Sequence, residues 1–144
     1  MNAYRIDLAA LLLRLTLGAV LVAHGLLKFL VFTLPGTAQF FAAAGFPGWT
    51  AYVVAPLEVA AGIAMLLGVR SALTATIVLP VLVGAAFVHA GNGWLFTNAN
   101  GGWEYPVVLI ALGVGVALLG DGAFALGRSR ETASAPVATA ARAT

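Results

Sequence analysis

The chain contains no cysteine among its 144 residues. This absence excludes disulfide bonds, thiol–disulfide exchange and attachment of a c-type haem, and we expect no iron–sulfur cluster ligated by this chain. Any redox role must therefore depend on a bound quinone, on a haem or metal held by histidine, or on a partner subunit.

Charged residues are also scarce, at 8% of the chain, against about 25% in an ordinary soluble domain. The seven lysines and arginines are scattered and form no basic patch, so a nucleic-acid partner is excluded. Hydrophobic residues make up 62% of the chain. This balance indicates a protein whose main neighbour is membrane lipid, with no room for a soluble catalytic domain.

Hydrophobic residues gather in four segments, at residues 8–30, 50–69, 72–90 and 105–119. A helix of about 20 apolar residues crosses the hydrocarbon core of a bilayer. We therefore predict an all-α fold, an integral membrane four-helix bundle over residues 1–127. In the first outer loop, at residues 31–49, proline and glycine interrupt a phenylalanine-rich stretch, which predicts a short interfacial helix. Residues 128–144 have low complexity and predict a disordered cytoplasmic tail.

The basic residues outside these segments indicate an orientation. Arg5 precedes the first segment, Arg70 joins the second to the third, and Arg128, Arg130 and Arg142 follow the fourth. Because cytoplasmic loops are enriched in lysine and arginine, we predict a multi-pass protein with both termini in the cytoplasm. The first segment carries Arg14 and lacks a convincing cleavage site, so we expect it to remain as a helix and not to be removed as a signal peptide.

Several ionisable residues lie inside or beside the apolar segments. Each such charge costs about 2.5–3.5 kcal/mol or more in a membrane unless it is paired or hydrated, so these positions are candidates for function. The candidate ligand-binding residues are Arg14, His24, Lys28, Glu58, His89 and Glu104.

Counting along the helices suggests which of these residues meet. Arg14 and Glu58 fall at similar depths, which predicts an ion pair that either fixes the helix register or forms the floor of an outward-facing polar pocket. His24 and His89 also share a depth, so they could hydrogen-bond a quinone, relay protons, ligate haem b or satisfy structural partners. Haem is the weaker of these interpretations, because little space flanks the histidines. Structural alternatives exist for Glu104, at a helix N-terminus, and for Lys28, which could extend to the outer surface.

In these residues the chain resembles the DoxX family of small four-helix membrane proteins. The resemblance extends over about residues 8–127 and rests on the order and spacing of short motifs at residues 13–18, 24–28, 40–41, 45–47, 58–62, 66–70, 89, 100–106 and 120–122. Related members include the membrane subunit of a thiosulfate:quinone oxidoreductase, and others belong to complexes that handle thiol or oxidative stress.

The resemblance implies a subunit of a quinone-linked oxidoreductase in the bacterial cytoplasmic (inner) membrane, with other subunits of a redox complex as partners and a homo-oligomer as a further possibility. Whether this chain itself takes part in catalysis is left open. The missing cysteines argue against direct sulfur chemistry by this chain. The alternative is a non-catalytic anchor or assembly subunit whose polar residues hold the bundle and grip a partner. A transporter ranks last, because the sequence has no inverted repeat.

Overall fold

A computed structural model describes residues 2–127, and within that range every regular element is a helix. The prediction of an all-α fold is confirmed there, including a short helix in the first long loop. The predicted tail at residues 128–144 lies outside the described residues. The elements are α1 (Ala3–Leu30), α2 (Leu34–Ala43), the short 3-10 helix η1 (Gly48–Thr50), α3 (Ala51–Leu67), α4 (Ser71–His89), a second 3-10 helix η2 (Ala90–Asn92) and α5 (Glu104–Leu119).

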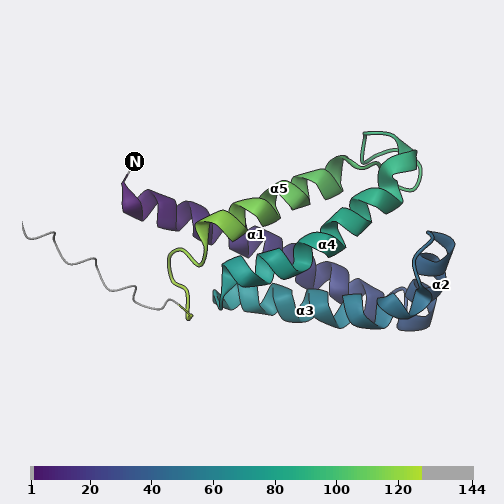
Figure 1. Cartoon of the computed structure of the whole chain (residues 1–144), viewed down its shortest axis with the longest axis horizontal. Coiled ribbons are helices and arrows are strands. Elements are labelled where there is room, and N and C mark those ends of the chain that lie inside the picture. Colours follow the sequence, from purple (N-terminus) through teal and green to yellow (C-terminus); the bar gives the residue numbers. More distant parts are fainter. Residues whose placement is uncertain (1, 128–144) are drawn as a thin grey trace, which may run out of the picture.

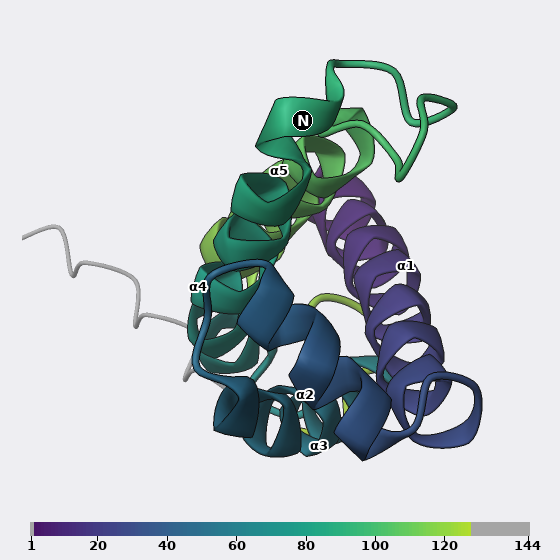
Figure 2. The same cartoon turned by 90° about the vertical axis from the view of Figure 1, so that its right-hand side faces the viewer.

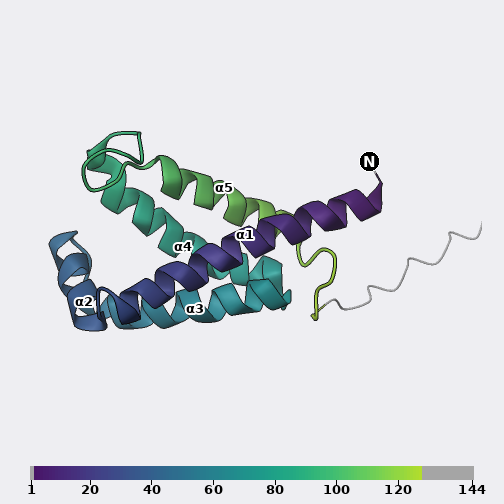
Figure 3. The same cartoon turned by 180° about the vertical axis from the view of Figure 1, so that it is seen from behind.

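The long helices form two antiparallel pairs, because α1 packs chiefly on α3 and α4 packs chiefly on α5. The pairs converge at the end that holds the short turn between α3 and α4, and they separate toward the opposite end (Figures 1 and 3). Seen from that open end, α2 lies across the bundle (Figure 2). Buried aliphatic side chains from all four long helices form the core, with Leu17, Met65, Val78 and Val116 fully enclosed.

Glycines set the register of the α1–α3 pair. A Cβ atom added to Gly62 would lie 2.7 Å from the carbonyl oxygen of Gly18, and one added to Gly25 would lie 2.6 Å from Cγ2 of Val59. Small residues at such a contact let two helix backbones approach closely, which is the common form of packing in lipid. The pair can therefore form only in a register that brings these glycines to the interface.

The end where the pairs converge is closed by backbone and capping contacts. Gly68 ends α3 in the left-handed conformation, with φ of 69°. Asp121, which follows α5, accepts a 2.6 Å hydrogen bond from the backbone N–H of Ser71 at the start of α4. A carboxylate is well placed there, because the first N–H groups of a helix have no partners within the helix.

Within residues 2–127, three helical stretches are long and apolar enough to cross a membrane: Ala3–Leu30, Gly48–Leu67 and Ser71–Asn92. The fourth apolar helix, α5, has 16 residues, so it extends over about 24 Å and is shorter than the usual span. The outer faces of the helices expose large apolar side chains such as Leu12, Leu73 and Leu118. Apolar surface on this scale suits contact with lipid rather than water.

Candidate functional site

Where the helix pairs separate they enclose a cavity of about 420 Å³, here called the central cavity. All four long helices contribute to its wall, and Phe40 and Phe41 of α2 line it as well. Most of the lining is apolar, as in ligand sites in general, where a few polar groups fix the orientation of the ligand. The ionisable residues of the central cavity are His24, Lys28, Glu58, His89 and Tyr105.

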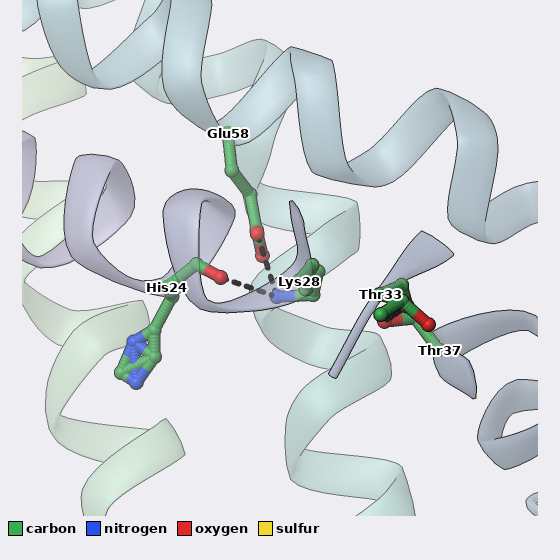
Figure 4. Close-up of polar contacts among 5 residues, drawn as sticks. All are labelled: His24, Lys28, Thr33, Thr37 and Glu58. Carbon is green, nitrogen blue, oxygen red and sulfur yellow. Dashed lines mark hydrogen bonds and ion pairs between the residues drawn. The ribbon is translucent and has the colours of Figure 1, made fainter. Parts of the chain in front are cut away.

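An ion pair joins α1 to α3 at the wall of the central cavity. The Lys28 ammonium donates a 2.6 Å hydrogen bond to Oε2 of Glu58, with the two side chains only 17% and 8% exposed. The same ammonium makes a longer bond, 3.4 Å, to the backbone carbonyl of His24 (Figure 4). Lys28 therefore turns back along its own helix toward the cavity, and the alternative that it extends to the outer surface is wrong.

The predicted ion pair between Arg14 and Glu58 does not form. The guanidinium of Arg14 is fully buried and donates to the backbone carbonyls of Met65 at 2.7 Å, Leu66 at 3.0 Å and Ala123 at 2.9 Å. The last carbonyls of a helix have no partner within it, so Arg14 caps α3 and ties the segment after α5 to it. Lys28 is 14 positions further along α1, or about 21 Å, and Arg14 does not line the central cavity.

His24 has a hydrogen-bonding atom without a protein partner. Its ring lies 5.9 Å from that of Tyr105, so the two side chains meet across the α1–α5 side of the cavity. Nδ1 of His24 is buried, and no group in residues 2–127 hydrogen-bonds to it. Figure 4 shows the imidazole directed away from the Lys28–Glu58 pair. An unsatisfied buried polar atom costs roughly 1–3 kcal/mol, which is consistent with a position used by a ligand.

His89 has the structural role that the sequence left open as one of its alternatives. Its Nδ1 lies 3.0 Å from the carbonyl oxygen of Asn100 and 3.1 Å from that of Gly101. Because only an N–H can satisfy a carbonyl oxygen, Nδ1 carries the proton, and Nε2 of the neutral ring is an acceptor. His89 thus holds the loop before α5 onto the end of α4 while its ring lines the central cavity.

Glu104, the last of the six candidate residues in the sequence, begins α5 and has a local role. Its Oε2 accepts a 3.3 Å hydrogen bond from the backbone N–H of Phe96, and the side chain does not line the central cavity. In the same loop the rings of Trp94 and Trp103 meet edge to face, 4.4 Å apart. The structure therefore brings His24, Lys28, Glu58 and His89 together and leaves Arg14 and Glu104 outside.

Tyr105 and the phenylalanines were missed as site residues. Tyr105 is not among the candidate ligand-binding residues, yet it faces His24 in the cavity wall. Phe46 lies between Phe41 and Phe87, with ring centroids 6.4 Å and 5.9 Å apart, so aromatic contacts connect the α2 region with α4. A cluster of aromatic residues around residues 40–46 was the available signal. Within residues 2–127 no group of three histidine or acidic side chains is arranged to hold a metal ion.

Comparison with known proteins identifies the family. The sequence model of the DoxX family matches residues 9–91, which is more than half of the chain. The chain belongs to the DoxX family. It is also 30% identical over 120 residues to the Bacillus subtilis (strain 168) protein named "Putative oxidoreductase CatD", covering 83% of this chain and 85% of that protein. No solved structure matches the chain significantly.

The DoxX match includes α2, α3, α4 and most of α1. Four of the cavity's ionisable residues, His24, Lys28, Glu58 and His89, fall inside it, whereas Tyr105 lies beyond it. Together with the long apolar helices, membership of the DoxX family makes this chain a membrane protein. The region that matches the family model therefore contains the Lys28–Glu58 ion pair and both histidines of the cavity wall.

Proposed function

We propose that this DoxX protein is a small membrane subunit of a quinone-linked oxidoreductase complex and that its central cavity binds the quinone. The observation that carries the proposal is a largely apolar cavity with a buried ion pair and an unpartnered imidazole nitrogen in its wall. A membrane relative named as an oxidoreductase supports a redox role. Without cysteine in the chain, a bound carrier is the simplest source of redox chemistry.

The polar groups of the wall fit a quinone head group. A lysine ammonium has three donors, and Lys28 uses two of them on Glu58 and on the His24 carbonyl. The third donor and Nδ1–H of His24 would hydrogen-bond quinone carbonyl oxygens, while Nε2 of His89 would accept from a hydroquinone hydroxyl. A bound quinone would supply two-electron, two-proton redox chemistry, and this chain's residues would orient the ring and hold protons.

The proposal includes a topology in which α1, α3, α4 and α5 all cross the bacterial cytoplasmic membrane. Both ends of the chain would then face the cytoplasm, following the distribution of arginines. The central cavity lies toward the end bearing α2 and the loop of residues 93–103, so it would be on the outward side. The 16-residue α5 would cross with help from flanking loop residues or local thinning of the bilayer.

The first test is native mass spectrometry of the protein extracted gently from its own membranes, followed by quinone binding to the purified chain. We expect a quinone adduct on the wild type and weaker binding in His24→Phe, which keeps a ring but removes the nitrogens. Glu58→Gln should lower quinone reduction by the assembled complex without releasing partner subunits. Glu104→Gln is the matched control, because it removes a carboxylate charge outside the cavity.

A second candidate, a non-catalytic anchor, is favoured by the surface of the loop before α5. Trp94, Leu95 and Phe96 there are between 45% and 65% exposed, which suits contact with a partner protein. Under this proposal Trp94→Ala would release the partner, whereas His24→Phe and Glu58→Gln would leave turnover unchanged. Full partner occupancy in the Trp94 variant together with lost quinone binding in the His24 variant would exclude it.

A further inference from the structure

A second cavity of about 380 Å³ lies beside the central cavity, between α1 and α2; we call it the side groove. Four residues line both spaces: His24, Lys28, Phe40 and Phe41. The two spaces therefore have a common wall, to which His24 and Lys28 contribute. The side groove lies directly beside the proposed quinone site.

The other residues of the side groove are Leu27 of α1, Phe32 just beyond it, and Gly36 and Thr37 of α2. Thr37 satisfies its own hydroxyl by donating 2.9 Å to the Thr33 carbonyl, so it offers the groove little polarity. Leu27 and Phe32 are 40% and 57% exposed, which places them on the outer surface of the bundle. The groove is thus an apolar cleft at the surface of the bundle that shares four lining residues with the central cavity.

The space between α1 and α2 follows from how α2 is held. It packs mainly on η1 and α3 and has few contacts with α1. At its start, Thr33 caps the helix by accepting a 3.3 Å hydrogen bond from the Gly36 N–H. Gly36 has no side chain, and a Cβ placed there would meet only Thr33 Oγ1 within 4 Å. Glycine at this position keeps the α2 wall of the groove free of bulk.

We infer that the ligand of the central cavity is an amphiphile with a cyclic polar head and a long hydrocarbon tail, and that the tail leaves through the side groove. This inference rests on the proposed quinone site and narrows its substrate class to quinones with hydrocarbon tails. Lipid is as apolar as the groove, so the groove adds little affinity for the tail. Its role is steric, because a head group inside the bundle needs an exit for its tail.

The test compares two quinones with the same head group, ubiquinone-0, which has no tail, and decylubiquinone. Dissociation constants are measured by titration of protein in nanodiscs, expressed per lipid to remove partitioning. Gly36→Phe fills the groove from α2, and Leu27→Trp narrows it from α1. We expect both variants to bind decylubiquinone at least about tenfold more weakly and ubiquinone-0 within about twofold of the wild type. Gly91→Phe, at an exposed glycine outside both cavities, is the matched control.

Unchanged decylubiquinone binding in both groove variants would overturn the tail route while leaving the quinone site intact. Wild-type protein that binds ubiquinone-0 but not decylubiquinone would also overturn it, because the groove would then be closed to a tail. If wild-type protein binds neither quinone, the proposed function and this inference fail together. The panel therefore separates failure of the route from failure of the site.

Discussion

Removing one member of the Lys28–Glu58 pair should cost far more stability than removing both. The bond is 2.6 Å long and its side chains are 17% and 8% exposed, so either partner left alone is a charge in a nearly dry environment. Breaking such a pair costs about 3–5 kcal/mol, whereas replacing both members by apolar residues is often nearly neutral. We therefore expect Lys28→Met and Glu58→Met each to lower the free energy of unfolding by about 3 kcal/mol or more.

The double variant, Lys28→Met with Glu58→Met, should return to within about 1 kcal/mol of the wild type. The measurement is reversible unfolding in bicelles, analysed as a double-mutant cycle. Glu104→Met serves as the control, since its 3.3 Å bond to Phe96 predicts a loss of about 1 kcal/mol. Single effects that simply add, with a coupling under about 0.5 kcal/mol, would refute the view that the two charges stabilise each other.

Other substitutions test the fold around the site. Gly62→Leu should prevent α1 and α3 from packing in their register and abolish the folded protein in detergent, because even a Cβ at this position would lie 2.7 Å from a carbonyl oxygen. The control is Gly84→Ala, whose added Cβ would lie 3.9 Å from its nearest neighbour. This variant should melt within a few degrees of the wild type. Arg14→Met should lower the free energy of unfolding by about 3 kcal/mol, since three backbone carbonyls, two of them in buried bonds, lose the guanidinium as a donor, and an unchanged denaturation curve would contradict that role. Asp121→Ala should cost about 1 kcal/mol by removing the cap on Ser71, as measured by the same unfolding titration.

Helices were predictable from the sequence because apolar runs in this chain are long and their ends are marked. Gly68 marks the end of α3, and Arg70, two residues later, lies in the turn as the N-cap of α4. The prediction that each of the four segments is long enough to cross a membrane holds by length for the stretches that contain α1, α3 and α4, whereas α5 is shorter. Depth along a helix was less predictable, because α1 begins at Ala3 rather than near residue 8 and extends beyond the rest of the bundle at that end (Figure 1).

The wrong partner for Glu58 follows from that error in register. Counting from helix ends assumes that the ends are level, whereas the contacts at Gly18, Gly25 and Gly62 determine how α1 and α3 slide past each other. In that register Arg14 lies beside the last turn of α3, and Glu58 lies within reach of Lys28. Gly18 and Gly25 face α3 and Gly62 faces α1, so the register depends on contacts between the two helices that counting from helix ends does not take into account. The cavity could not be predicted, since it depends on the angle between the helix pairs.

Three of the six candidate residues have structural roles that their contacts explain. Arg14 caps a helix, Glu104 holds a loop, and Nδ1 of His89 is engaged by two carbonyls, so stability explains these groups. A buried polar atom without a partner costs free energy, and two of the candidate residues carry one: Nε of Arg14 and Nδ1 of His24. The rest of the Arg14 guanidinium caps α3, so its position is explained by the fold. His24 differs because it lines both the central cavity and the side groove, where a ligand could satisfy Nδ1. If the His24→Phe variant is more stable than the wild type yet binds quinone more weakly, that unsatisfied nitrogen is retained for a ligand; if it is less stable and binds equally well, His24 belongs with the structural residues.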